Sequence, residues 1–355
     1  MVPKGRISQL VSSYDHKKLT IATVCSHTSL QIFDGARREG FRTIGICIGQ
    51  PPKFYDAFPK AKPDEFYSVK SYKEIPSRAA ELARMNAVVV PHGSFVEYLG
   101  INAFESLQLP TFGNRGVLQW ESDREKQREW LVGAGLSMPE KIARPEDITK
   151  PVLVKFYGAK GGRGFFIAKN YEEFMEVNPT EKHTIQEYVI GTRYYMHFFY
   201  SPLVDKGYRL SKGSLELMSM DRRDEANIDE MYKLGAQERL KGFGILPSFV
   251  VTGNVPVVIR ESLLPKAFWM GERTVERSME LFGGIVGPFS LECIVTDKLE
   301  FKVFEISARI VAGTNFFIRS SPYSDLREPE MSVGRRIAKE IKLARRLKAL
   351  DAVLS

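Results

Sequence analysis

The stretch "VLVKFYGAKGGRGFF", residues 152–166, sets four glycines and three basic side chains between two apolar segments. A P-loop needs GxxxxGK followed by Ser or Thr, and a dinucleotide-binding turn needs GxGxxG leading from a strand into a helix. Neither pattern fits. Because "VLVKF" and "FFIAK" both have strand character, the glycine loop is predicted at the tip of a β-hairpin. Protein kinases use a glycine-rich hairpin of this kind to cover the phosphates of ATP.

Small residues in such a loop let the backbone approach phosphate oxygens, and Lys155, Lys160 and Arg163 supply positive charge. The alternative is a flexible surface turn, which needs only one or two glycines. We therefore predict that residues 158–164 form a flap over a nucleotide, with Lys155 on the preceding strand facing its phosphates.

A second polar pattern lies far downstream, in "FKVFEISAR". In an extended strand Glu305, Ser307 and Arg309 are two residues apart and share one face. The neighbouring strand "SLECIV" offers Glu292 beside them. Two carboxylates on paired strands suit Mg²⁺, which takes one or two protein carboxylates plus phosphate oxygens and water. The alternative is a solvent-facing polar stripe on an edge hairpin.

The N-terminal part has the order strand, helix, strand in "LTIATVCSHTSLQIFDGARREGFRTIGICIG", and "AVVVPHGSF" repeats it. Continuous apolar runs are typical of parallel strands buried on both faces, so a small doubly wound sheet is predicted. Ligands bind at the carboxyl ends of such strands, which places residues 26–29 and 92–94 on one rim. These two loops, the N-terminal rim, are expected to bind an anion. The alternative is that Ser26 or Thr28 only caps the following helix.

The remaining pattern changes along the chain. One helix is predicted over about 115–134, then mostly antiparallel strands from 151, a long helix over roughly 261–282, a hairpin and a terminal helix. The terminal segment "GRRIAKEIKLARRLKAL", residues 334–350, offers Ile337, Ile341, Leu343 and Leu347 to a buried face. It is predicted to be a solvated basic helix that closes the fold, in preference to an RNA-binding helix.

Composition limits the classes of function. The chain has 355 residues, 43% hydrophobic and 26% charged, which allows two or three domains with real cores. The net charge of +8 suits an enzyme with anionic ligands, and the interleaved charges argue against a nucleic-acid partner. Three scattered cysteines suggest neither a disulfide framework nor a zinc site. Without an apolar run of about 18 residues or a leader, we expect a soluble, cytoplasmic protein with no membrane partner.

Together the strand lysine, the glycine hairpin, "QEYV" at 186–189 and the paired glutamates ending in "EISAR" resemble an ATP-grasp ligase. Nine ordered blocks from about residue 19 to the end, "VVVPHGSFVEYLG", "TGNVPVVIRESLL" and "FEISARIVAGTN" among them, are similar to the archaeal formate-dependent 5-formaminoimidazole-4-carboxamide ribotide synthetase family. The resemblance implies a mixed α/β and α+β chain: an ATP-grasp fold preceded by the doubly wound parallel-sheet domain.

The resemblance also implies an activity. ATP, formate and the aminoimidazole carboxamide ribotide would give the formylated ribotide, ADP and phosphate through formyl phosphate, in purine synthesis. His27, Ser94 and Asn254 would bind the ribotide, Glu292 and Glu305 would hold Mg²⁺ or Mn²⁺, and these two glutamates with Arg309 would be catalytic. The residues implied to bind ATP are Lys155, Gly158, Lys160, Gly161, Gly162, Arg163, Gly164, Gln186, Glu187, Tyr188, Val189 and Glu225.

Three parts are predicted: residues 1–116 as the substrate-binding domain, 117–198 as the lid and 199–355 as the catalytic part, in an assembly of several copies. Two features depart from the family pattern. Ser307 stands where ATP-grasp ligases usually carry Asn, and "MYKLGAQERLKGFG" at 231–244 replaces an "IPAKDQ"-like segment. The rival hypotheses are a ligase of the same chemistry with another acid or amine, a purine-sensing regulator without catalysis, and an RNA-binding protein.

Overall fold

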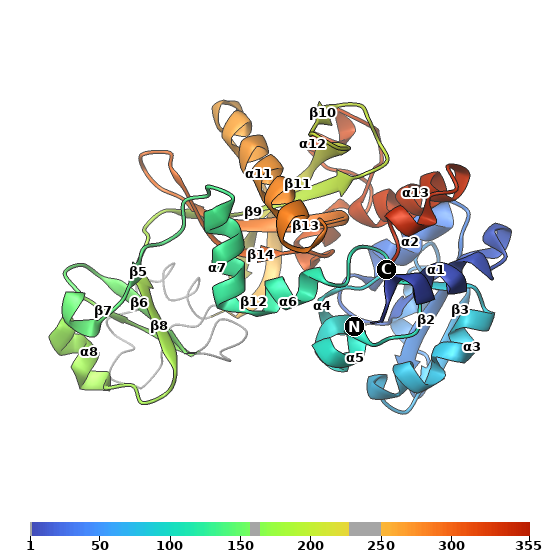
Figure 1. Ribbon diagram of the computed structural model, residues 1–355, viewed down its shortest axis with the longest axis horizontal. Coiled ribbons are helices and arrows are strands. Elements are labelled where there is room, and N and C mark those ends of the chain that lie inside the picture. Colours follow the sequence, from blue (N-terminus) through green and yellow to red (C-terminus); the bar gives the residue numbers. More distant parts are fainter. Residues whose placement is uncertain (1, 157–163, 227–249) are drawn as a thin grey trace.

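The computed structural model describes residues 2–156, 164–226 and 250–355. Three β-sheets follow one another along the longest axis of the molecule (Figure 1). The parallel sheet lies at one end, a small antiparallel sheet lies at the other, and a six-stranded sheet lies between them. In these described ranges no helix is both long and apolar enough to span a membrane.

The N-terminal sheet is parallel, as predicted, with the strand order β3-β2-β1-β4. Its strands are β1 (Thr20–Val24), β2 (Arg42–Ile48), β3 (Glu65–Val69) and β4 (Ala87–Val89). Every residue of β1 is buried, as expected for a strand covered on both faces. The helices of this part are α1 (Lys4–Ser12), α2 (Ser29–Arg38), α3 (Ala79–Arg84), α4 (Gly93–Leu99) and α5 (Ile101–Glu105).

The glycine hairpin belongs to the small antiparallel sheet, whose order is β5-β8-β6-β7. Its elements are β5 (Lys141–Ile142), β6 (Val152–Phe156), β7 (Phe165–Ala168), β8 (His183–Glu187) and the covering helix α8 (Tyr171–Val177). β6 pairs with β7 up to Lys155 and Phe165, so the two flanks form the predicted hairpin. Gly164, directly before β7, has a φ of 75°, a conformation that favours glycine.

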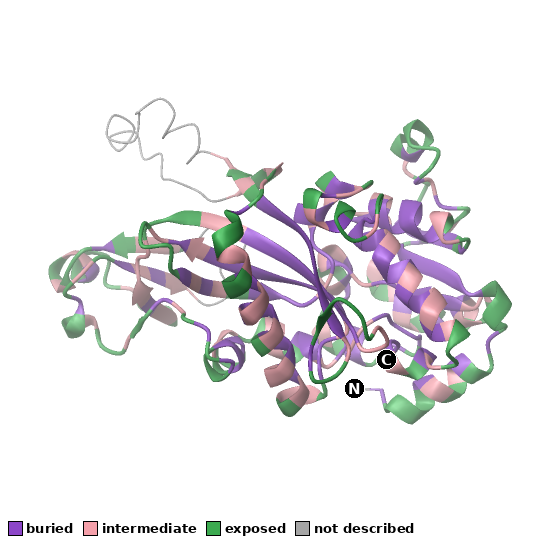
Figure 2. Cartoon of the chain, turned by 90° about the horizontal axis from the view of Figure 1, so that it is seen from above, coloured by how far each residue is buried: buried purple, intermediate pink, exposed green. Residues whose placement is uncertain are grey.

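The central sheet is antiparallel, with the order β10-β11-β9-β13-β14 and β12 paired to β11. Its strands are β9 (Thr192–Ser201), β10 (Tyr208–Arg209), β11 (Ser214–Glu225), β12 (Val251–Pro256), β13 (Gly287–Val295) and β14 (Phe301–Ser307). The long helix α11 (Leu264–Phe282) packs on one face, where Gly271 lies against Leu215 and Phe198. Figure 2 shows the inner strands of this sheet as a continuous buried layer.

The segment predicted as one helix over 115–134 forms two helices, α6 (Val117–Ser122) and α7 (Arg124–Gly133). Asp123 separates them in an extended conformation, and its carboxylate accepts hydrogen bonds from the backbone N–H groups of Glu125 and Lys126. A capping aspartate of this kind starts a new helix, which explains the break.

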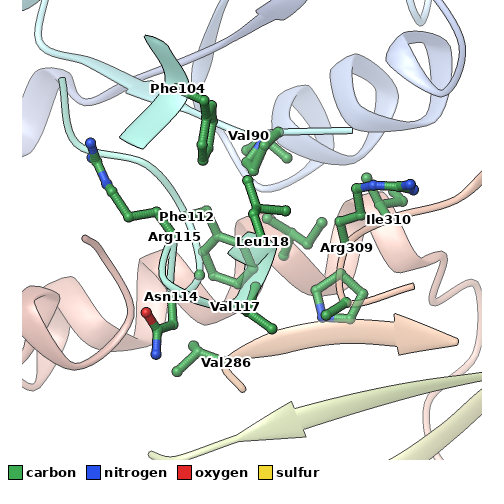
Figure 3. Close-up of a pocket in the computed structure, with 15 residues that line it drawn as sticks. Val90, Phe104, Phe112, Asn114, Arg115, Val117, Leu118, Val286, Arg309 and Ile310 are labelled. Atoms are coloured by element: carbon green, nitrogen blue, oxygen red, sulfur yellow. The ribbon is translucent and has the colours of Figure 1, made fainter. Parts of the chain in front are cut away.

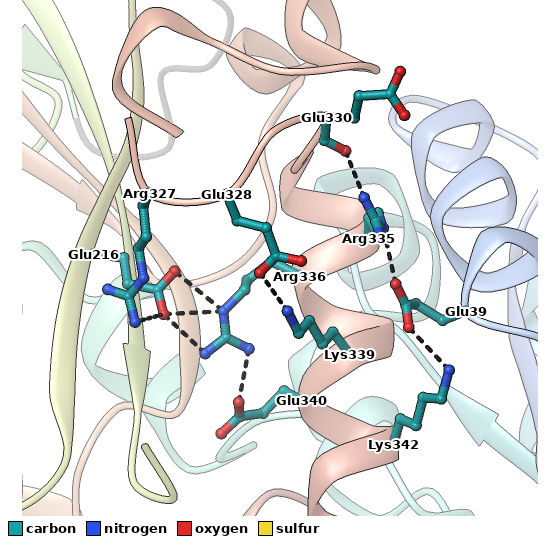
Figure 4. Close-up of polar contacts among 10 residues, drawn as sticks. All are labelled: Glu39, Glu216, Arg327, Glu328, Glu330, Arg335, Arg336, Lys339, Glu340 and Lys342. Atoms are coloured by element: carbon teal, nitrogen blue, oxygen red, sulfur yellow. Dashed lines mark hydrogen bonds and ion pairs between the residues drawn. The ribbon is translucent and has the colours of Figure 1, made fainter. Parts of the chain in front are cut away.

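The terminal helix α13 (Val333–Arg346) is less solvated than predicted. Ile337 and Ile341 are buried, but Arg336 and Glu340 are buried as well, whereas Leu347 is 54% exposed. Figure 4 shows α13 joined by ion pairs to two separate parts of the chain. Arg336 donates to Glu216 of β11 at 2.9 to 3.1 Å. On the other side, α13 packs on α2.

The short helix α12 (Pro322–Asp325) and the single turn at Ala312–Phe317 complete this part. The turn at Ala312–Phe317 packs on β11 and, through Gln31, on α2, because the Gln31 side chain donates to Thr314 Oγ1 at 2.6 Å and to Asn315 Oδ1 at 2.9 Å. It therefore connects the N-terminal rim with the central sheet. The predicted domain boundaries stay predictions; β9 runs across the one at residue 198.

Candidate active site

Two glutamates face each other on the central sheet. Glu292 of β13 and Glu305 of β14 are register partners, so their side chains lie on the same face. The Ser307 hydroxyl donates to Glu292 Oε1 at 3.4 Å. The predicted meeting of the two carboxylates and the serine therefore occurs.

The Glu305 side chain remains exposed to solvent, although protein crowds it on several sides. Desolvation by this protein, followed by the charge of Glu292, raises the pKa of the Glu305 carboxyl. Two neighbouring carboxylates favour a cation between them, because the cation neutralises both negative charges. The described residues hold no group of three side chains of the metal-binding types His, Cys, Asp and Glu. A pair of glutamates still fits Mg²⁺ or Mn²⁺ bound together with nucleotide phosphates, because hard cations take oxygen ligands and keep water.

Arg223 of β11 is a residue of this site that the sequence interpretation missed. Its guanidinium donates to Glu292 Oε1 at 3.0 Å and lies 3.5 Å from the centre of the Tyr195 ring. Burial alone would lower the pKa of Arg223, but Glu292, Tyr195 and Asp221 together more than offset it, and the pKa is raised. The signal was present, because Asp221, Arg223 and Glu225 alternate along one strand as Glu305, Ser307 and Arg309 do.

Lys155 reaches the same site from β6 of the small sheet. Its ammonium lies 5.8 Å from the centre of the Phe304 ring. Desolvation lowers the pKa of Lys155, and the Glu305 carboxylate opposes that change. The strand lysine of the glycine hairpin thus points toward the paired glutamates, as a phosphate-binding lysine would have to.

The other predicted ATP-binding residues divide into two groups. Gly158, Lys160, Gly161, Gly162 and Arg163 lie outside the described residues, as does the segment 231–244. Gln186 and Glu187 end β8, followed by Tyr188 and Val189. Glu187 accepts a hydrogen bond from the Glu140 backbone N–H at 3.1 Å. Glu225 forms an ion pair with Arg193 at 2.9 Å.

The N-terminal rim approaches the central sheet. His27 has a φ of 54°, which is uncommon for a residue with a side chain, and its ring stacks on that of His92 at 5.8 Å. Burial, then the charges of Arg309 and Arg223, lower the pKa of His27. Ser26 donates to Ser94 Oγ at 3.3 Å, which joins the two loops of the rim.

His92 itself is completely buried and bonds to the Val24 carbonyl at 3.2 Å. Burial lowers its pKa to about 3, so this imidazole is neutral and supports the rim from within. The capping alternative for the other loop fails, because Thr28 precedes α2 without a side-chain hydrogen bond to that helix.

Arg309 lies just beyond β14 and forms an ion pair with Glu121 of α6 at 2.9 Å. The second oxygen of Glu121 accepts from the Ala308 backbone N–H at 3.0 Å. Glu121 therefore orients Arg309, and sequence reasoning missed it because the two residues are far apart in the chain. Gly93 of the rim leaves room for the Arg309 guanidinium, since a Cβ on this residue would lie 3.3 Å from it.

A cavity of about 30 Å³ lies beside Arg309, between the N-terminal part and the central sheet (Figure 3). Its lining is mostly apolar, with Phe112, Val117 and Ile310 among the side chains. The volume is enough for one or two water molecules but not for a nucleotide. The residues predicted to bind ligands, apart from Arg309, do not line this cavity.

Asn254 of β12 lies opposite Arg223 in the sheet, and its amide nitrogen donates to Asp221 Oδ2 at 2.7 Å. The described site thus combines residues from three parts of the chain. The hairpin contributes Lys155, and the rim contributes His27 and Ser94. The central sheet and its margin contribute the glutamate pair, Arg223, Asn254 and Arg309.

Known proteins resemble this chain over its whole length. A family model described as "Protein of unknown function (DUF1246)" matches residues 21–142, and one described as "Domain of unknown function (DUF1297)" matches residues 168–355. The chain is 64% identical over 356 residues to the 5-formaminoimidazole-4-carboxamide-1-(beta)-D-ribofuranosyl 5'-monophosphate synthetase of Methanococcoides burtonii, with 100% of both proteins covered. The protein of the same name from Korarchaeum cryptofilum is 44% identical over 370 residues, again with 100% of both covered.

Solved structures support the same relationship as these sequence comparisons. The IMP biosynthesis protein PurP from Thermococcus kodakaraensis has a TM-score of 0.72 and 29% identity, covering 94% of this chain and 100% of that one. The ADP complex of an N5-carboxyaminoimidazole ribonucleotide synthetase has a TM-score of 0.63 at 14% identity, covering 91% of this chain and 76% of that one. The second likeness concerns the fold alone, which is the predicted ATP-grasp fold. The chain therefore belongs to the 5-formaminoimidazole-4-carboxamide ribofuranosyl 5'-monophosphate synthetase family.

Proposed function

We propose that the protein is an ATP-dependent carbon–nitrogen ligase that formylates the 5-amino group of the aminoimidazole carboxamide ribotide, using formate, in purine biosynthesis. The products are the formylated ribotide, ADP and phosphate. One observation carries the proposal: the N-terminal rim is joined to the central sheet just beyond the strand that carries Glu305, because His92 forms a β-bridge with Ile310, next to Arg309. An acceptor on the rim would therefore be close to a nucleotide phosphate on that sheet.

ATP would bind between the small antiparallel sheet and the central sheet. Lys155 would contact its phosphates, residues 186–189 would contact the adenine, and Glu225 would contact the ribose. The glycines and cations of residues 158–164 would cover the phosphates. A divalent cation, Mg²⁺ or Mn²⁺, held by Glu292 and Glu305 would neutralise charge on the phosphate oxygens.

The chemistry has two steps. A formate oxygen attacks the γ-phosphorus of ATP, the bond to the β-phosphate oxygen breaks, and formyl phosphate and ADP result. The ribotide amine then attacks the formyl carbon, loses a proton, and expels inorganic phosphate. Arg309, oriented by Glu121, would stabilise negative charge on the transferring phosphoryl group. Exclusion of water by the closed hairpin would protect the acyl phosphate from hydrolysis.

On the acceptor side, His27, Ser94 and Asn254 would bind the ribotide. The lowered pKa of His27 keeps its imidazole neutral near pH 7, so it can accept a hydrogen bond from a sugar or amine group. A second candidate, the same chemistry with another acid or amine, is favoured by the unusual sequence at 231–244. The resemblance further leads us to propose a cytoplasmic assembly of several copies, which light scattering tests.

The test is a coupled assay of ADP release with each substrate omitted in turn. We expect release only when ATP, the ribotide and formate are all present. Glu305→Gln should slow it about 100-fold, because the charge at the phosphates is lost. Glu300→Gln, an exposed position on the same hairpin, is the matched control and should behave as wild type. Formate-independent release, or a Glu305→Gln variant with normal rate, contradicts the proposal.

A further inference from the structure

Asp221 of β11 is completely buried, and both of its oxygens are engaged. His197 of β9 bonds to Oδ1 through Nε2 at 2.6 Å, and the Asn254 amide nitrogen donates to Oδ2 at 2.7 Å. His197 is also buried, with 2% of its side chain exposed. Neither Asp221 nor His197 takes part in the proposed chemistry, and the contact to Asn254 connects both of them to the acceptor side of the site.

The surroundings hold Asp221 in one position. β11 is paired on both sides, with Asp221 opposite Tyr195 of β9 and Pro256 of β12. Gly313 packs directly on the carboxylate, and a methyl group on its Cα would overlap Oδ1. The two hydrogen bonds and the packing of Gly313 therefore favour one orientation of the carboxylate.

A fixed Asp221 determines which end of the Asn254 amide reaches the ligand. An ionised carboxylate only accepts hydrogen bonds, so the NH₂ group of Asn254 must face Asp221. The amide is planar and its oxygen points the other way from its nitrogen. Asn254, which is only partly buried, therefore turns its carbonyl oxygen rather than its NH₂ group away from Asp221, where a ligand can reach it.

We propose that Asp221, supported by His197, is a positioning residue that makes Asn254 a hydrogen-bond acceptor for an N–H or O–H group of the acceptor substrate. The inference rests on the proposed function, in which Asn254 binds the ribotide. It also predicts specificity: an acceptor substrate without this N–H or O–H group leaves the Asn254 carbonyl oxygen without a hydrogen-bond partner and binds more weakly.

Exchanging the side chains of Asp221 and Asn254 tests which of the two must donate the hydrogen bond between them. In Asp221→Asn the new amide permits either orientation of Asn254, and in Asn254→Asp two carboxylates repel each other. We expect each single variant to bind the ribotide about tenfold more weakly in calorimetric titration of the full chain, as for loss of a charge-assisted hydrogen bond. The double variant Asp221→Asn/Asn254→Asp restores the pair, since residue 221 donates and residue 254 still presents an acceptor oxygen. Its affinity should return to within about threefold of wild type.

The control is Asp224→Asn, an exposed carboxylate of the same strand. It should bind as wild type. A double variant no better than the weaker single one, or an Asp221→Asn variant with wild-type affinity, overturns the proposal. If wild-type protein does not bind the ribotide at all, the proposed function itself fails, which separates the two outcomes.

A second set of variants covers the case in which Asp221→Asn does not fold. His197→Ala removes the donor to Asp221, whereas His197→Gln keeps an N–H group near it. We expect the KM for the ribotide to rise about tenfold in His197→Ala and to recover in part in His197→Gln, with the KM for ATP unchanged in both. Equal changes in both KM values, or no recovery by glutamine, indicate a merely structural role and contradict the inference.

Discussion

Replacing Arg336 by Met should destabilise the protein strongly, because α13 is fixed to the central sheet by this side chain. Arg336 is 5% exposed, donates to Glu216 at 2.9 to 3.1 Å and to Glu340 at 2.7 Å, and lies 4.2 Å from the centre of the Phe199 ring. The contacts with Glu216 and Glu340 are visible in Figure 4. Without Arg336, the buried carboxylates of Glu216 and Glu340 each lose a hydrogen-bond donor and a neighbouring positive charge.

Breaking a buried ion pair by removing one partner costs about 3–5 kcal/mol. Glu216 keeps Arg327 at 3.0 Å and Glu340 keeps the Ser201 hydroxyl at 2.6 Å, so we expect the lower end, about 3 kcal/mol. With a urea dependence of about 3 kcal/mol per molar, the unfolding midpoint should fall by about 1 M. Circular dichroism in a urea titration measures it.

Arg273→Met is the matched control, since Arg273 forms a more exposed pair with Glu276 on α11. Exposed pairs contribute less than about 1 kcal/mol, so its midpoint should hardly change. Adding Glu340→Gln to Arg336→Met should recover stability, because the uncompensated charge disappears. An Arg336→Met midpoint equal to the control, or a double variant less stable than Arg336→Met alone, refutes the reasoning.

Three further results are expected. Lys155→Met should raise the Kd for a fluorescent ATP analogue at least about tenfold by removing a charged phosphate contact, and an unchanged Kd would exclude that contact. Glu121→Gln should lower kcat about tenfold without changing the Kd for ATP, because glutamine is uncharged and replaces one of the two carboxylate oxygens that contact Arg309 and the Ala308 N–H group; a normal kcat contradicts the orienting role. Burial opposes the ionisation of Glu39, but hydrogen bonds from α13 more than offset it and lower its pKa. Its stabilisation is therefore present above about pH 4.3 and lost as acid protonates it, so the thermal midpoint should fall more steeply in acid for wild type than for Glu39→Gln; parallel pH curves would show that Glu39 contributes nothing.

Some parts of the fold could be predicted because the order of apolar and polar residues within a single strand was sufficient. The apolar run of β1 indicated burial on both faces, and the alternation of Glu305 and Ser307 placed them on the face where Glu292 lies. The flanks of the glycine loop indicated a hairpin for the same reason. In each case the prediction rested on how apolar and polar side chains are spaced along the strand.

Features that depend on register or on distant partners were missed. Asp221 meets His197 and Asn254 only because β9, β11 and β12 align with one another, which no single segment specifies. Arg336 was expected in solvent because its charge is local information, whereas its partner Glu216 lies 120 residues away. The break at Asp123 was hidden for a different reason, since the helical pattern continues on both sides of the cap.

The central claim, that formate is activated by phosphorylation before it reaches the amine, is tested most directly by isotope transfer. Formate carrying ¹⁸O at both oxygens is supplied with ATP and the ribotide, and the products are analysed by mass spectrometry. The mechanism predicts one ¹⁸O atom in inorganic phosphate and one in the new formyl group, because the formate oxygen that attacks phosphorus leaves with the phosphate. Phosphate without ¹⁸O, formed together with the formylated product, would contradict the account.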